Sequence, residues 1–300
     1  MSNIENQLIK ELRDKLEIIS VTNESNIQGE QQWISNIKRL NTLVKEENPE
    51  SFLQWDVIKR TMVVGNADFI DIELQFLKSL TDWEDRWKPA IKEVKSGEPT
   101  LYPEYPESSG NLIHHAYHIA QFENTSGFKV SDMNIIFEFG GGYGNMYRLL
   151  SNLGFKGKYI IFDFSQFSAL QEYFIKSLGL KVLTIDNFKT ANSGVLCISD
   201  LEDLRQALSQ CADIKEAMFL ATWSISETPI SFRESILSLV TKFRYYLIAY
   251  QGQFEDNNNI EYFNLWKNTL EDFEWVSFKI EQIPNTYYRD NFYLIGNYKK

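Results

Sequence analysis

The feature that most constrains the fold is a change of pattern near residue 133. Before it, apolar residues recur at three- and four-residue spacing over 7–19, 33–44 and 68–80, which predicts helices. After it, short apolar strands alternate with helical segments. Strands joined by helices require parallel crossovers, so this half predicts a doubly wound α/β sheet. We therefore expect a helical cap and linker over 1–130 and an α/β domain over 131–300.

The expected elements can be placed by residue number. Strands are expected over 134–139, 158–163, 181–185, 217–221, 245–250, 275–283 and 288–298, with helices over 145–153, 165–178, 201–210, 230–243 and 260–273. A turn at Pro284-Asn285, of only about four residues, separates the last two strands, which is too few for a crossover, so they should pair antiparallel. Three prolines within 99–106 predict a loop. A helix over 111–122 should follow, capped by Ser108 or Ser109.

The strongest chemical signal is the sequence EFGGGYG at residues 138–144, between an expected strand and an expected helix. Glycines suit such a turn because they adopt positive φ and let a ligand approach the backbone. The free N–H groups of the next helix add a positive end. A dinucleotide fingerprint fails because Asn145 or Tyr147 stands where its last glycine belongs, and the second glycine and the lysine of a P-loop are missing.

What remains is E-x-G-x-G-x-G, which resembles motif I of the class I S-adenosylmethionine-dependent methyltransferases. The resemblance implies that Glu138 faces the methionine end of the cofactor. It also implies that the glycines, namely Gly140, Gly141, Gly142 and Gly144, approach the ribose and the amino-acid portion. The fold it implies is Rossmann-like, with a seven-stranded mixed sheet in the order 3-2-1-4-5-7-6. The closing hairpin fits the reversed seventh strand of that sheet.

Two acids extend this hypothesis. Asp163 ends the second expected strand, nineteen residues after Gly144. An acid there can accept both hydroxyls of a ribose, and in the family it binds the adenosine ribose. Capping of the next helix is the alternative. Asp186 ends the third expected strand, where the family often has a polar residue that contacts adenine.

Three longer stretches narrow the resemblance. They are IFEFGGGYGNMYRLL, FKGKYIIFDFSQFSALQEYFI and, upstream, SSGNLIHHAYHIAQFE. These are similar to the sugar O-methyltransferases of bacterial surface-polysaccharide gene clusters, over roughly residues 102–300. That family also has an N-terminal helical region. The resemblance implies methyl transfer from S-adenosylmethionine to a hydroxyl of a sugar or a surface-glycan precursor.

All three histidines of the chain, His114, His115 and His118, lie within five residues. On a helix His114 and His118 share one face, while His115 points about 100° away. A neutral imidazole suits general-base catalysis near pH 7, and an alcohol is a weak nucleophile until its proton is removed. The family resemblance therefore makes one of them a base or a substrate-orienting group; packing between cap and sheet is the alternative. We expect no metal, because the Glu of H-E-x-x-H and a compact carboxylate cluster are both missing.

The segment after the fourth expected strand, TWSISETPISFRE, lies at the sheet edge where open α/β sheets bind ligands. Glu227 is a second candidate base if its pKa is raised, and Ser226 either contacts a ligand or caps the next helix. Further candidates for the substrate site, each equally explained as a partly buried or surface side chain, are Tyr102, Tyr105, Tyr117 and Arg289.

Composition restricts the partners. A net charge of −11 and the lack of an N-P-P-Y motif disfavour nucleic acid, and an anionic sugar nucleotide would need a local basic site. Only Cys197 and Cys211 are present, so we expect no disulfide framework and a cytoplasmic location. Neither a secretory leader nor a membrane span is expected. A methyltransferase for another small metabolite or glycan decoration, or a non-catalytic binding module, remains the alternative, and the oligomeric state stays open.

Overall fold

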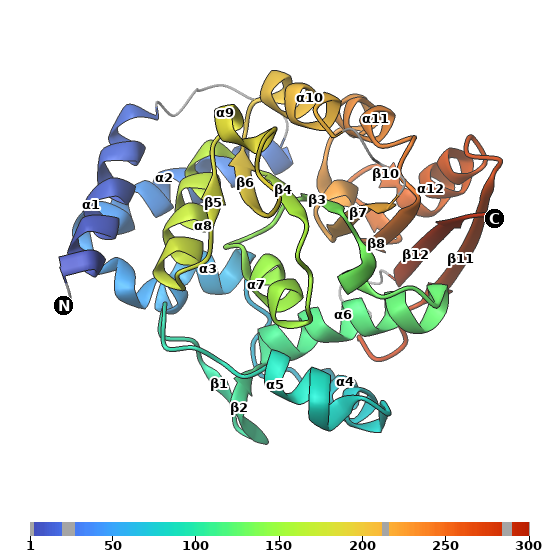
Figure 1. Cartoon of the computed structure of the whole chain (residues 1–300), viewed down its shortest axis with the longest axis horizontal. Coiled ribbons are helices and arrows are strands. Elements are labelled where there is room, and N and C mark those ends of the chain that lie inside the picture. Colours follow the sequence, from blue (N-terminus) through green and yellow to red (C-terminus); the bar gives the residue numbers. More distant parts are fainter. Residues whose placement is uncertain (1–2, 20–27, 212–215, 284–289, 300) are drawn as a thin grey trace.

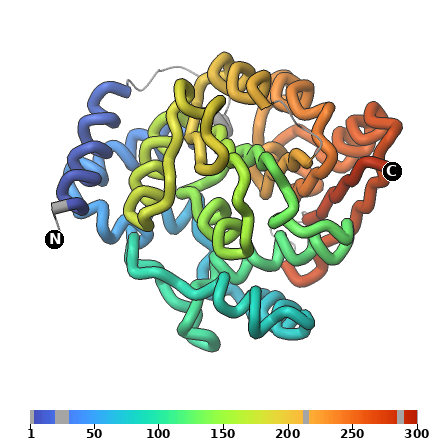
Figure 2. The backbone as a smooth tube through the Cα atoms, in the orientation of Figure 1, coloured from blue at the N-terminus to red at the C-terminus, as the bar shows by residue number. Residues whose placement is uncertain are grey.

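A central sheet with helices on both faces dominates the protein (Figure 1). The computed structural model describes residues 3–19, 28–211, 216–283 and 290–299, and the structural statements below concern these ranges. The expected turn at Pro284-Asn285 and the candidate Arg289 lie outside them. The first helix and the last strand stand on opposite sides of the view in Figure 2.

The eight strands of the sheet run in the order β11-β12-β8-β7-β3-β4-β6-β5. Neighbours from β8 to β5 are parallel, and β12 is antiparallel to both β8 and β11. The strand bounds are β3 Ile135–Phe139, β4 Lys158–Phe162, β5 Val182–Leu183, β6 Gly194–Ile198, β7 Ala217–Thr222, β8 Tyr245–Gln251, β11 Phe273–Lys279 and β12 Asn291–Tyr298.

The expected order 3-2-1-4-5-7-6 is confirmed for the seven expected strands, including the antiparallel closing hairpin. The expected number of strands is wrong, because β6 is inserted between the second and the third of them. The sequence of β6, GVLCI, is short and buried throughout, so it has no alternation that would reveal a strand. The third expected strand is reduced to the two-residue edge strand β5.

The expected helices are confirmed, with ends that differ by up to six residues, the most at the expected helix 260–273. In the cap the helices are α1 Asn3–Ile18, α2 Gln28–Glu46, α3 Asp56–Thr61, α4 Phe69–Ser79 and α5 Lys88–Ala90, with η1 Pro49–Gln54 and the π-helical turn η2 Trp83–Trp87. Around the sheet they are α6 Gly110–Ser126, α7 Asn145–Asn152, α8 Ser165–Ser177, α9 Ile185–Phe188, α10 Leu201–Ser209, α11 Ile230–Leu239 and α12 Asn259–Lys267, with η3 Val130–Asp132 and η5 Ile225–Glu227. The short helices α3, α5 and α9 were not expected.

Two small hairpins complete the chain. The first, β1 Leu101–Tyr102 with β2 Tyr105–Ser109, replaces the expected loop over 99–106, and the second pairs β9 Gln253–Phe254 with β10 Asn257–Asn258. Ser109 caps α6 as expected, since its side chain accepts a hydrogen bond from the Leu112 amide at 3.2 Å.

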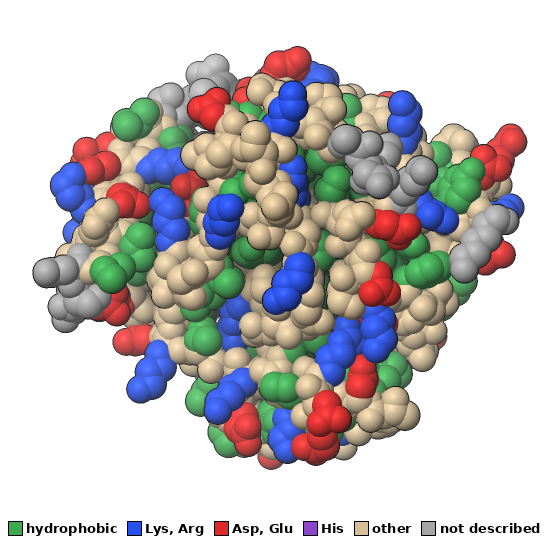
Figure 3. All heavy atoms as spheres, in the orientation of Figure 1, with side chains coloured by type: hydrophobic (Ala, Val, Ile, Leu, Met, Phe, Trp, Pro, Cys, Tyr) green, Lys and Arg blue, Asp and Glu red, His purple; other side chains and the backbone are tan. Residues whose placement is uncertain are grey.

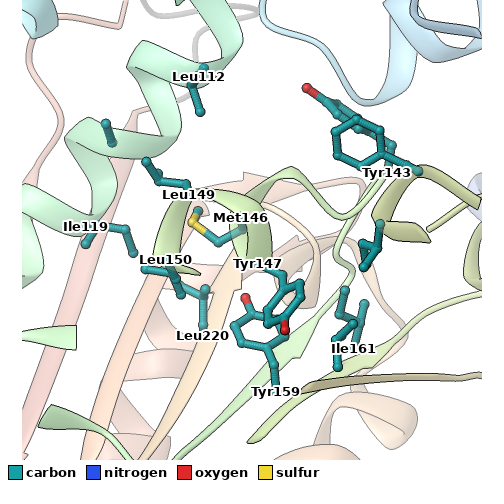
Figure 4. Packing of buried hydrophobic residues seen from close by; sticks show 14 of the residues in the cluster. Leu112, Ile119, Tyr143, Met146, Tyr147, Leu149, Leu150, Tyr159, Ile161 and Leu220 are labelled. Atoms are coloured by element: carbon teal, nitrogen blue, oxygen red, sulfur yellow. The ribbon is translucent and has the colours of Figure 1, made fainter. Parts of the chain in front are cut away.

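Two apolar cores lie on the two faces of the sheet, because successive strand residues point to opposite faces. Ile136 of β3 belongs to the core under α6, α7 and α8, while Phe137 belongs to the core under α10, α11 and α12. Figure 4 shows Tyr147 of α7 beside Tyr159 of β4, and Leu150 of α7 between Ile119 of α6 and Leu220 of β7. Cap residues such as Phe52 and Leu74 join the first core, so cap and sheet share one apolar interior.

A buried ion pair fixes the cap to α7. Arg148 contacts the carboxylate of Glu93 and donates to the Lys92 carbonyl at 2.6 Å. The two charged side chains are only 4 % and 6 % exposed. Glu93 also accepts from the Ser109 hydroxyl, at 2.6 Å. The pair therefore connects α7, the segment after α5 and the first turn of α6.

We expect Arg148→Met to lower the free energy of unfolding by about 3 kcal/mol or more, because Glu93 would stay buried without a cationic partner. Urea denaturation measures this. The control is Arg205→Met, which removes a surface pair with Glu202 whose side chains are 48 % and 76 % exposed. That change should cost no more than about 1 kcal/mol. Equal losses in the two variants would contradict the role of the buried pair.

Candidate functional site

A cavity of about 1340 Å³ opens at the carboxyl ends of β3, β4 and β7. Ligand pockets usually measure about 300–1,000 Å³, so this one has room for two ligands side by side. Three parts of the chain line it: the loops that follow the strands, the N-terminal half of α6, and cap residues between Trp33 and Phe69.

The glycine loop has the conformation that its spacing suggested. Gly140, Gly142 and Gly144 have φ of +74°, +55° and +89°, which favour glycine. A Cβ on Gly140 would overlap the side chain of Ser224, which follows β7. Gly140, Gly141 and Gly142 line the cavity, while Gly144 is the N-cap residue of α7 and packs against Ile175 of α8.

Glu138 lies beneath this loop and lines the cavity, although its side chain is nearly buried. The Tyr159 hydroxyl donates to its Oε2 at 2.9 Å. Burial raises the pKa of Glu138 to about 8, against the opposing effect of this hydrogen bond. The site thus holds a carboxyl group that a cation would convert to carboxylate.

Asp163 follows β4 and faces the same cavity. Its carboxylate accepts from the Phe164 amide at 2.8 Å and from Gln171 Nε2 at 3.0 Å. Burial raises its pKa to about 7, against opposing hydrogen bonds that include the amides of Gly141 and Gly142. Asp163 makes no side-chain cap of α8, so the capping alternative does not apply.

Gln171 was missed by sequence reasoning. It donates both to Asp163 and to the Gly142 carbonyl, the latter at 3.0 Å, and so connects the acid to the glycine loop. The sequence feature that could have identified Gln171 is its position eight residues after Asp163, on the helix that follows.

The expected place of Asp186 needs correction. It lies exposed in the first turn of α9 and is not part of the cavity lining. The physical reason is β6, which occupies the position beside β4 and moves the end of the expected third strand away from the site. Ser199, directly after β6, lines the cavity instead.

The three histidines of α6 all line the cavity, and His114 and His118 share a face as expected, with ring centroids 4.2 Å apart. Nδ1 of His114 lies 2.9 and 3.0 Å from the two carboxylate oxygens of Glu73, a fully buried residue of α4. Nδ1 of His118 is hydrogen-bonded to the Tyr293 hydroxyl. His115 points toward α7, where Asn145 Nδ2 donates to its Nδ1 at 3.2 Å.

The surroundings of two of these imidazoles lower their pKa and so favour the neutral ring. Burial, helped by His114 and Arg148, lowers the pKa of His115 to about 3. Burial and the two neighbouring histidines hold the pKa of His118 well below its usual range. Nε2 of His118 is buried and has no hydrogen-bond partner among the residues the structure describes.

The loop after β7 completes the site. Trp223 has φ of +70°, a strained conformation for a bulky residue, and its ring lies parallel to that of His114 at 6.4 Å between centroids. Glu227 lines the cavity and accepts from Gln251 Nε2 at 2.7 Å. Sequence reasoning found Glu227 but missed Glu73, Trp223 and Gln251.

Other sequence candidates lie elsewhere. Ser226 is buried, donates to the Trp223 carbonyl at 2.7 Å and does not cap α11. None of the three candidate tyrosines forms part of the cavity lining, namely Tyr102, Tyr105 and Tyr117. Cys197 and Cys211 are buried and free.

The described ranges contain no group of three or more His, Cys, Asp or Glu side chains that could hold a metal ion. None of the helices in those ranges combines the length and apolar content needed to cross a membrane. On the face shown in Figure 3, Lys and Arg side chains are interspersed with Asp and Glu.

The known proteins that this chain resembles are only distantly similar to it in sequence. No protein-family model matches the sequence, and no curated protein matches it. Among solved structures, the chain is similar to the METTL16 MTase domain, with 11 % identity over 77 % of this chain and 79 % of that one and a TM-score of 0.46. It is also similar to magnesium protoporphyrin IX methyltransferase from Synechocystis PCC 6803 with bound SAM, with 11 % identity over 78 % and 100 % and a TM-score of 0.40.

A third similar structure is precorrin-6y C5,15-methyltransferase from Geobacter metallireducens GS-15, with 13 % identity over 70 % of this chain and 98 % of that one and a TM-score of 0.40. The strand order, the reversed β12 and the glycine loop after β3 are features of the chain itself. The protein has an α/β Rossmann-like fold with a mixed central sheet.

Proposed function

We propose that the protein transfers a methyl group from S-adenosylmethionine to a hydroxyl of a sugar or a surface-glycan precursor. The observation that supports this most is one cavity that joins two unlike halves. One half has the glycine loop, Glu138 and Asp163, and the other has the histidines of α6.

The first half fits the cofactor in charge and in hydrogen bonding. Asp163 is placed to accept the ribose hydroxyls, and Glu138 offers a buried carboxylate for the cationic methionine end. The three cavity-lining glycines let a ligand approach their backbone closely. When bound, S-adenosylmethionine supplies a methyl carbon already activated by the sulfonium.

The second half suits an acceptor with both a hydroxyl and an apolar face. Met62, Val63, Val64 and Phe69 of the cap line it together with Trp223 and the imidazoles. Aromatic faces stack on sugar rings. The candidate tyrosines Tyr102, Tyr105 and Tyr117 lie outside this lining, so Trp223 takes that role in the proposal. Among the described lining residues Arg60 is the sole Lys or Arg, so an anionic acceptor would have one local cation.

Apolar side chains of the cap line this half and would exclude water from around a bound acceptor, which favours methyl transfer. An acidic chain with a cavity of this size supports a small-molecule acceptor rather than nucleic acid. The free, buried cysteines support a reducing, cytoplasmic location. A non-catalytic binding module would bind the cofactor and yet methylate no component of a cell extract.

Asp163→Ala should weaken binding of S-adenosylmethionine by about 10- to 100-fold, because two charge-assisted hydrogen bonds to the ribose are lost. Isothermal titration calorimetry of the wild type should give a dissociation constant in the micromolar range. The matched control is Asp186→Ala, which removes an exposed aspartate outside the cavity and should leave the affinity unchanged. Intact, folded wild type without binding would overturn the cofactor assignment.

Cofactor binding should also release protons. At pH 7 the pKa values of about 8 for Glu138 and about 7 for Asp163 keep part of both carboxyl groups protonated, and a bound cation favours their ionised forms. Calorimetry in buffers of different ionisation enthalpy should therefore show release of about one proton, and affinity should rise between about pH 6 and 9. Glu138→Gln should remove most of the release. A binding heat independent of the buffer would contradict these assignments.

A further inference from the structure

We propose that His114 is the general base of this reaction and that Glu73 of the cap is its positioning residue. Nε2 of His114 takes the acceptor proton, while Glu73 fixes the tautomer of the imidazole and stabilises its protonated form. The inference rests on the proposed methyl transfer and specifies which group performs its proton step.

The contact between Glu73 and His114 assigns the two ring nitrogens. Both carboxylate oxygens of Glu73 lie within 3.0 Å of Nδ1. A carboxylate only accepts hydrogen bonds, so Nδ1 carries the hydrogen in the neutral ring. Nε2 is then the unprotonated nitrogen, and His114 lines the cavity in which the acceptor half is proposed.

Three elements hold this pair. Glu73 comes from α4 and also accepts from Gln282 Nε2, after β11, at 3.2 Å. The Phe69 ring meets the imidazole edge-on at 5.6 Å, and Trp223, in its strained conformation after β7, lies parallel to it. Glu73 is fully buried and is bonded to His114, so a protonated His114 would compensate a carboxylate shielded from water.

The other histidines lack this arrangement. Asn145 donates to Nδ1 of His115, and its amide orientation is set by Arg148, which donates to Oδ1 at 3.3 Å. The hydrogen of neutral His115 therefore sits on Nε2, which leaves no free acceptor nitrogen. Nδ1 of His118 pairs with the neutral hydroxyl of Tyr293, and within the described part of the chain no carboxylate is bonded to this imidazole to stabilise its charged form.

The proposed step balances as follows. The acceptor oxygen forms a bond to the methyl carbon while the sulfur–methyl bond breaks, and the electron pair of that bond stays on sulfur, which becomes a neutral thioether. The hydroxyl proton moves to Nε2 of His114. The imidazolium later loses this proton to solvent, which restores the resting site.

The experiment exploits the fact that the chain has only three histidines. Protein labelled with ¹⁵N-histidine gives three imidazole spin systems, assigned by His114→Gln, His115→Gln and His118→Gln. At pH 7.5 we expect a hydrogen on Nδ1 of His114 and none on Nε2. In Glu73→Gln the amide can either donate or accept, so both tautomers of His114 should be populated, and Glu73→Asp should retain the preference for hydrogen on Nδ1. The ionisable groups near the pair are His115, His118 and Tyr117 of α6 and Tyr293 of β12.

Two further measurements separate this inference from the proposed function. Glu73→Gln and His114→Gln should keep the wild-type affinity for S-adenosylmethionine in calorimetry. With the first methyl glycoside or sugar nucleotide that the wild type methylates, both variants should lower kcat about 100-fold or more. A His114 that is doubly protonated at pH 7.5, or that carries its hydrogen on Nε2, would overturn the base assignment even where the cofactor binds normally.

Discussion

Parallel pairing of β3 with β4 and β7 is the constraint on which the site depends. Phe139 pairs with Phe162, and Glu138 with Leu220, so the three strands end at one level of the sheet. The glycine loop, Asp163 and Trp223 leave the sheet from these ends and meet at one cavity. The loop after β7 then presses so closely on the loop after β3 that position 140 has room only for a hydrogen atom. The sheet, rather than any single side chain, therefore shapes the half of the cavity proposed for the cofactor.

The half of the cavity proposed for the acceptor depends on the cap. α4 packs along α6, and α1 and α2 pack on α8 (Figure 1), and residues of α2 and α4 contribute to the cavity lining. This packing brings Glu73 to His114 across 41 positions of sequence and keeps both side chains away from water. Electrostatic interactions strengthen as water is removed, so the packing that buries Glu73 makes its carboxylate effective. The buried Arg148–Glu93 ion pair fixes the cap to α7 next to the first turn of α6.

Local patterns in the sequence predicted the parts of the site that local geometry decides. The glycine spacing, the acid after β4 and the i,i+4 pair on α6 each follow from a strand end or a helix period. The strand β6 was not predicted, because four buried apolar residues between polar turns have no period. Its insertion in the sheet moves Asp186 away from the site. Glu73 left a signal that was not used: it stands on the buried stripe of α4 with Ile70, Leu74 and Leu77, where a carboxylate needs a partner. The backbone strain at Trp223 arises from tertiary packing and has no local signature.

The placement of the buried carboxyl groups explains how such a site would handle charge. In the proposed reaction one positive charge leaves the sulfonium and one appears on the imidazole, so charge is moved rather than created. Glu138 lies at the cofactor half and Glu73 behind His114, both nearly free of contact with solvent. A preorganised carboxylate at each end of the path can stabilise the charge before and after transfer without reorganising water. An uncharged acceptor between them then needs no counter-ion of its own, which is consistent with a lining that offers Arg60 as its one Lys or Arg among the described residues.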